Sequence, residues 1–153
     1  MIDRVTFERT TYNELPFKFE AGTPNYIGAI GLGAALDYLN GIGLENIQNY
    51  EKKLLDYATA KLTAIKGLKL YGTADNKICI FSFLLDNVHP YDVGMFLDKM
   101  GIAVRTGHHC THPLWDHFGT EGSVRASLVF YNTIEEIDFL CEAIKKIQKS
   151  FGV

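Results

Sequence analysis

Hydrophobic residues recur every three or four positions along four stretches of this chain. That spacing is typical of helices that bury one face. We therefore predict helices at residues 24–39, 44–66, 90–100 and 133–147. Residues at their ends support the assignment. Thr23 is expected as the N-cap of the first helix, with Pro24 in its first turn. Thr133 with Glu136 has the pattern of a capping box, and Gly101 is expected as a C-cap.

Shorter runs that are apolar throughout, or that alternate between apolar and polar residues, predict strands. These runs cover residues 68–71, 78–85, 102–104 and 123–131, with weaker signals at 5–7 and 10–12. The run 78–85 is apolar enough for a central strand. In the run 123–131, Arg125 alternates away from the apolar face. The expected fold class is α+β, with a small, mostly antiparallel sheet covered by helices.

Composition limits the possible classes of function. The chain has 153 residues, of which 47% are hydrophobic and 22% charged, and its formal net charge is −3. These values predict one globular domain, and the mild charge argues against nucleic acid or an anionic membrane as a partner. The apolar runs are too short to span a bilayer, and the first residues lack a signal-peptide pattern. Three cysteines without Cys-x-x-Cys spacing favour a reducing, cytoplasmic location over a disulfide framework.

The segment Arg-Thr-Gly-His-His-Cys, from Arg105 to Cys110, carries the strongest chemical signal. It places a cysteine next to two histidines and five residues after an arginine. Nearby positive charge favours the thiolate, which is the reactive form of cysteine. The competing interpretation is a surface loop with an unreactive thiol. Cys79 and Cys141 lie in apolar patterns, where cysteine acts as a small hydrophobic residue.

Two further residues are candidates for binding anions. The planar fork of Arg125 suits a carboxylate, although an arginine on a strand is more often simply solvated. Thr23 stands at a predicted helix N-terminus, which is a natural phosphate site, although a merely capped helix explains it equally. A zinc site is the alternative use of the histidines near Cys110. The five candidate ligands are His108, His109, Cys110, His112 and His117. Their spacing fits none of the common zinc motifs, so no metal site is predicted.

Several motifs occur in order along the chain. They are Phe-Glu-Ala-Gly-Thr-Pro-Asn at 19–25, Gly-Leu-Gly-Ala-Ala-Leu at 31–36, Val-Arg-Thr-Gly-His-His-Cys at 104–110 and Val-Arg-Ala-Ser at 124–127, followed by Tyr-Asn-Thr at 131–133. Together they resemble the C-terminal portion of the SufS-type cysteine desulfurases of the class V aminotransferase family. The resemblance covers essentially the whole chain. It implies the small C-terminal domain of a fold-type I pyridoxal-phosphate (PLP) enzyme. Residues 1–24 would lead in from a large domain, and residues 25–153 would form the small one.

The resemblance also implies an activity. Enzymes of this family take sulfur from L-cysteine, leave L-alanine, and hold the sulfur as a persulfide for an acceptor protein in iron–sulfur cluster assembly. Cys110 matches the nucleophile, Arg125 the arginine that holds the substrate carboxylate, and Arg105 a second arginine of that pocket. Thr23 matches a threonine that reaches the cofactor phosphate from the other subunit of a homodimer.

The chain departs from the family pattern in two respects. The cofactor lysine of the family lies in a Ser-x-His-Lys context, and no lysine here follows a histidine. We therefore expect the segment alone to be inactive. Thr111 and His112 replace the Ala-Gln common in relatives, which affects the surroundings of the nucleophile. Two alternative functions stay open, namely a binding-only or dimerisation domain and a selenocysteine lyase.

Overall fold

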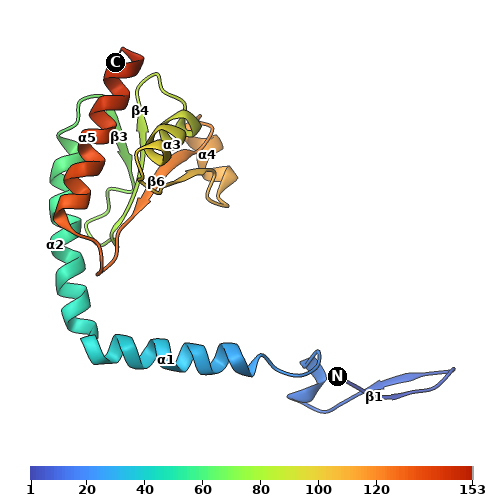
Figure 1. Ribbon diagram of the computed structural model, residues 1–153. Coiled ribbons are helices and arrows are strands. Elements are labelled where there is room, and N and C mark those ends of the chain that lie inside the picture. Colours follow the sequence, from blue (N-terminus) through green and yellow to red (C-terminus); the bar gives the residue numbers. More distant parts are fainter. Residues whose placement is uncertain (153) are drawn as a thin grey trace. The chain divides into compact units, whose positions relative to one another are not determined.

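The computed structural model describes residues 1–152, which form two units, Met1–Leu44 and the residues from Glu45 onward. The first unit begins with an antiparallel hairpin of β1 (Ile2–Val5) and β2 (Thr10–Tyr12) (Figure 1). A short 3-10 helix, η1 (Phe17–Phe19), and helix α1 (Tyr26–Ile42) follow. The first strand lies at residues 2–5 and not at the predicted 5–7, whereas the predicted strand at 10–12 is confirmed.

Helix α1 begins later than its sequence pattern predicts. Asn25 is the N-cap, and its side chain accepts a hydrogen bond from the backbone N–H of Gly28 at 2.9 Å. The prediction that Thr23 caps the helix is therefore wrong. Asparagine caps helices at least as well as threonine, and the cap at position 25 leaves Pro24 outside the helix.

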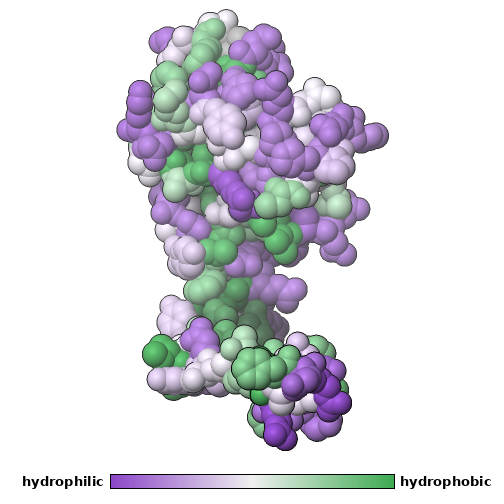
Figure 2. All heavy atoms as spheres, turned by 90° about the vertical axis from the view of Figure 1, so that its right-hand side faces the viewer, coloured by the Kyte–Doolittle hydropathy of each residue, from purple (hydrophilic) through white to green (hydrophobic). Residues whose placement is uncertain are grey.

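No residue of α1 is buried, although its sequence pattern predicts one buried face. Its large apolar side chains lie at the surface, among them Tyr26, Ile27, Ile30, Leu32, Leu36 and Tyr38. Figure 2 shows hydrophobic residues gathered at the surface of this unit. A unit of about 40 residues is too small to bury such a stripe by itself. No single helix within residues 1–152 could cross a membrane, and α1 meets that test only when joined to α2 (Leu44–Thr63) as a bent pair.

The second unit is built on a four-stranded antiparallel sheet in the order β3-β4-β6-β5. The strands are β3 (Leu68–Tyr71), β4 (Ile80–Leu85), β5 (Arg105–Gly107) and β6 (Ser123–Ser127). The helices that accompany them are α3 (Pro90–Lys99), α4 (His112–Phe118) and α5 (Ile134–Phe151). This arrangement confirms the expected α+β class and the antiparallel sheet.

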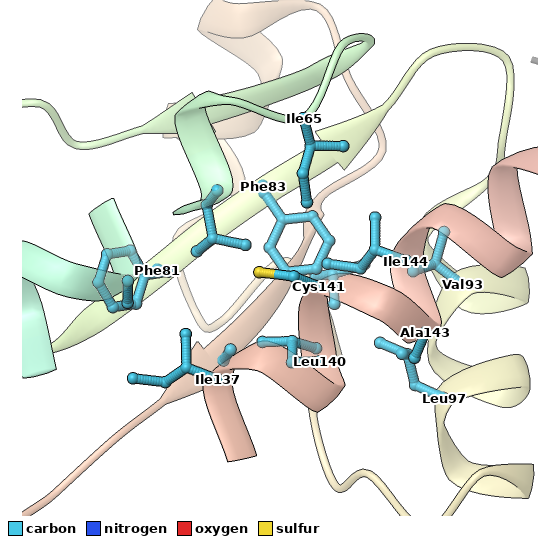
Figure 3. Packing of buried hydrophobic residues seen from close by; sticks show 14 of the residues in the cluster. Ile65, Phe81, Phe83, Val93, Leu97, Ile137, Leu140, Cys141, Ala143 and Ile144 are labelled. Atoms are coloured by element: carbon cyan, nitrogen blue, oxygen red, sulfur yellow. The ribbon is translucent and has the colours of Figure 1, made fainter. Parts of the chain in front are cut away.

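One face of the sheet carries the hydrophobic core. Phe81 and Phe83 of β4 and Val124 of β6 are buried there against side chains of α2, α3 and α5 (Figure 3). Helix α5 contributes the longest stripe, which consists of Ile137, Leu140, Cys141, Ala143, Ile144 and Ile147. The predicted capping box starts this helix, because Thr133 and Glu136 bond each other's backbone N–H groups. Because side chains alternate along a strand, the residues between these buried positions point to the opposite face of the sheet.

Strand boundaries differ from the predicted ones at three places. β5 begins at Arg105 and not at residue 102, because the N–H of Ile102 bonds the carbonyl of Leu97 at the end of α3. β6 ends at Ser127, because the chain then turns. In this turn the backbone N–H of Asn132 donates to the carbonyl of Val129, and the side-chain oxygen of Asn132 accepts from the N–H of Val129. β4 begins two residues later than predicted.

Candidate functional site

The sheet face opposite the core carries a row of polar side chains. Tyr71, Ser82, Arg125 and Arg105 are direct cross-strand partners on β3, β4, β6 and β5. Directly opposed residues of neighbouring strands point to the same face, and the neighbours of Ser82 and Arg125 are buried in the core. The side chains of Arg105 and Arg125 therefore leave the sheet on the same face, from paired positions at the β6–β5 end of the row.

No counterion within residues 1–152 balances these two arginines. None of the ion pairs in that part of the chain includes Arg105 or Arg125. Arg125 is half-buried, and its Nε atom is buried without a hydrogen-bond partner in the described part of the chain. An unpaired buried donor on a cation is unfavourable in the isolated chain. A carboxylate bound at this face would balance the positive charge.

The loop after β5 carries Cys110 in an unusual backbone conformation. His109 and Cys110 have φ angles of 52° and 63°, in the left-handed region. Each such residue costs about 1–2 kcal/mol when it is not glycine. The carbonyl of His108 anchors the turn by accepting three bonds: from the Thr111 N–H at 2.9 Å, the Thr111 hydroxyl at 2.7 Å and the Trp115 indole N–H at 2.9 Å. The Cys110 side chain is left exposed.

His109 links this loop to the sheet. Its Nε2 atom lies 3.1 Å from the hydroxyl of Ser123, which is fully buried at the start of β6. Burial lowers the pKa of His109, and the positive charge of Arg125 lowers it further. The imidazole is therefore neutral at neutral pH. The expectation that both histidines add positive charge beside Cys110 is wrong for His109, because the sequence alone does not reveal this burial.

His108 of the loop stacks on His112, the first residue of α4. The rings of His108 and His112 lie 4.0 Å apart at an angle of 12°. Among residues 1–152, no three His, Cys, Asp or Glu side chains are grouped so that they could hold a metal ion. Stacking therefore accounts for the proximity of these two rings.

The remaining cysteines have the structural role predicted for them. Cys79 and Cys141 are 3% and 4% exposed, within the hydrophobic core. Burial raises the pKa of the Cys79 thiol to about 11 and also raises the pKa of Cys141. A thiol with a raised pKa is a poor nucleophile at neutral pH. Cys110 is the one exposed cysteine of the three.

The second unit thus brings together Arg105, Arg125 and the loop of Cys110. Thr23 belongs to the first unit, where it is exposed and lies two residues before the N-cap of α1. Ser123 also belongs to this site, although no sequence motif singled it out. Its place two residues before Arg125 on an alternating strand is a signal that could have placed it on the arginine side of the sheet.

Comparison with known proteins gives consistent matches. The family described as aminotransferase class-V matches residues 1–140. A probable cysteine desulfurase of Xylella fastidiosa is 47% identical over 99% of this chain and 36% of its own length. A cysteine desulfurase of Synechococcus elongatus is 52% identical over 97% of this chain and 24% of its own length. The apo structure of a cysteine desulfurase from Thermococcus onnurineus has a TM-score of 0.85 and 37% identity, over 97% of this chain and 38% of that one. The chain therefore spans a quarter to about two fifths of the length of these relatives.

Proposed function

Because this chain belongs to the aminotransferase class-V family and its relatives are cysteine desulfurases, we propose that it is the C-terminal part of a SufS-type cysteine desulfurase. The full-length protein would use PLP to take sulfur from L-cysteine, leave L-alanine, and supply an acceptor protein for iron–sulfur cluster assembly. We further propose a cytoplasmic homodimer, for which the three unpaired cysteines suit a reducing compartment.

One observation carries the proposal. An exposed cysteine follows the edge strand of a sheet face on which two arginines occupy paired positions, with no counterion among residues 1–152. Arginine pairs of this kind suit the carboxylate of an amino acid. Arg125 would bind that carboxylate in bidentate fashion through the terminal nitrogens of its guanidinium, and Arg105 would add charge from the exposed edge. Substrate held by its carboxylate at this face would lie on the side of the sheet that the Cys110 loop borders.

Cys110 would act as the nucleophile. Its thiolate would attack the sulfur of L-cysteine, so that an S–S bond forms and the bond between the substrate sulfur and Cβ breaks. The electron pair of the broken bond passes to Cβ, which takes up a proton to give L-alanine. Cys110 keeps the transferred sulfur as a persulfide. The balance needs no external oxidant or reductant, because one sulfur atom moves from carbon to the thiol.

PLP, when bound, supplies an electron sink for the carbon skeleton of the substrate. The residues present fit part of this requirement. Thr23 is exposed just before a helix N-terminus, a position that suits contact with a phosphate. The unpaired arginines fit the negative charge of the substrate. The lysine that would carry PLP is expected in the remaining part of the full-length protein.

The full-length protein with PLP tests the proposal. After mixing with L-cysteine, we expect L-alanine in solution and one additional sulfur atom on the peptide that contains Cys110, measured by mass spectrometry. In Cys110→Ala the persulfide should be absent, while the absorbance change of PLP on cysteine binding should remain. Cys79→Ala serves as the matched control and should keep the persulfide on Cys110.

Other outcomes would assign other functions. Turnover of selenocysteine with little turnover of L-cysteine would indicate a selenocysteine lyase. If neither substrate reacts and PLP is not retained, a binding or dimerisation domain becomes the better interpretation, and the exposed apolar stripe of α1 is the feature that favours it.

A further inference from the structure

The conformation of the Cys110 loop needs an explanation that the proposed chemistry does not supply. His109 and Cys110 are consecutive residues with positive φ angles, and neither is glycine. Within residues 1–152 only Asn87 shares this conformation among the other non-glycine residues. Such backbone persists only where surrounding contacts hold it. The contacts that hold this pair therefore decide where the sulfur of Cys110 points.

The side chain of His109 makes the contact that ties this pair to the sheet. Its Nε2 atom lies 3.1 Å from the Ser123 hydroxyl, and Ser123 is the cross-strand partner of Gly107, two residues before His109. The imidazole also packs edge-on against Trp115, with ring centroids 6.2 Å apart, and Trp115 is only 2% exposed. His109 is thus held between a buried hydroxyl and a buried ring. Its neighbour Cys110 is exposed and has no comparable contact of its own within the described residues.

The protonation state of His109 suits an anchor. Burial and the charge of Arg125 keep its pKa low, so the ring is neutral and has one N–H and one free nitrogen lone pair. The Ser123 hydroxyl can either donate to or accept from Nε2, so the contact is satisfied in either tautomer. The other ring nitrogen is buried and has no hydrogen-bond partner among the described residues. This position does not favour proton exchange with solvent.

We propose that His109 is a positioning residue, which holds Cys110 for attack on the substrate sulfur through its bond to Ser123. The inference rests on the proposed desulfurase function and adds a residue to it. It predicts that losing this bond leaves substrate binding by the arginines intact, and that it slows the sulfur-transfer step. Small misplacements of a reacting group lower rates by up to about 100-fold, so a fall of roughly 10–100-fold is expected.

Two substitutions separate the side-chain contact from the backbone conformation. His109→Asn suits the left-handed backbone, because asparagine is enriched there, but its short side chain does not reach Ser123. His109→Gln suits that backbone less, but its terminal amide lies about where Nε2 of histidine does and can bond the hydroxyl. If the side-chain contact matters, His109→Gln is the more active variant. If only the backbone matters, His109→Asn is.

The experiment measures single-turnover persulfide formation in the full-length protein with PLP, together with the absorbance change on binding L-cysteine. We expect His109→Asn and Ser123→Ala to form persulfide about 10–100-fold more slowly, with an unchanged binding signal, and His109→Gln to stay within about threefold of wild type. The double variant, which combines His109→Asn with Ser123→Ala, should be no slower than either single variant. His117→Asn, at an exposed position of α4, is the matched control and should match wild type.

Several results would overturn the inference. Persulfide formation at the wild-type rate in both His109→Asn and Ser123→Ala would do so, and so would a His109→Gln variant slower than His109→Asn. If His109→Asn fails to fold in thermal unfolding, Ser123→Ala decides by itself. If wild type forms no persulfide at all, the proposed function fails, which is a different result from a wild type that is active and variants that equal it.

Discussion

Replacing Arg125 with alanine should weaken the binding of L-cysteine by a predictable amount. The guanidinium is half-buried on the sheet face, its Nε has no partner, and it belongs to no ion pair within residues 1–152. Truncating one partner of a buried, hydrogen-bonded charge pair costs about 2–5 kcal/mol. Because Arg105 stays next to the site, we take the lower part of this range, about 2–3 kcal/mol. That corresponds to roughly 30–150-fold in apparent affinity.

The assay uses the full-length protein with PLP and two ligands, L-cysteine and its methyl ester. The ester lacks the carboxylate charge, so wild type should bind it more weakly than L-cysteine. Arg125→Ala should lose most of this difference, because the group that distinguishes the ligands is gone. Arg125→Lys should fall between, since lysine keeps the charge without the bidentate fork. Arg105→Ala should have a smaller effect, because that side chain is exposed.

Stability separates this effect from general damage. Arg105 and Arg125 are direct cross-strand partners of like charge, an arrangement that destabilises a sheet. Arg125→Ala should therefore leave the thermal midpoint unchanged or slightly raised while binding is lost. Equal affinity of wild type and Arg125→Ala for L-cysteine, with the preference over the ester intact, would refute the carboxylate role.

Three further predictions concern the fold around the site. His109 has a lowered pKa in the folded chain, so the unfolded chain binds more protons. The unfolding free energy should therefore fall as the pH drops below about 6.5. In denaturant titrations at several pH values, His109→Asn should show a weaker dependence on pH. In the same titrations, Gly122→Ala should lower the unfolding free energy more than Gly119→Ala. Both glycines have positive φ angles, at which alanine costs about 1 kcal/mol. A Cβ atom at position 122 would in addition lie 2.5 Å from the backbone of Gly107, whereas the space around position 119 is open. Ile144→Ala, in the centre of the core, should lower the unfolding free energy by about 2–5 kcal/mol, and a loss below about 1 kcal/mol would contradict the packing described.

The helices α1, α2, α3 and α5 could be predicted from the sequence because their signals are local. The periodic spacing and the capping box at Thr133 need no information from other parts of the chain. Strand boundaries depend on distant partners, and there the predictions were less accurate. Arg105 belongs to β5, where it is the cross-strand partner of Arg125 on β6. No local pattern around residue 105 reveals that pairing.

The site was predictable in its residue types and less so in its electrostatics. Cys110 and Arg125 stood out by motif and alternation, and their chemical roles stay predictions. The neutral state of His109 follows from its burial beside Arg125, which only the folded arrangement provides. The contribution of Ser123 likewise depends on a side chain from one strand meeting a loop that follows another.

The three cysteines also allow unfolding of the chain to be followed by thiol labelling. Cys79 and Cys141 are buried and have raised pKa values, whereas Cys110 is exposed. A mild alkylating dye at neutral pH should therefore attach at a single position of the native chain, and at all three after denaturation. Counting attached dye molecules would follow unfolding without engineered labels.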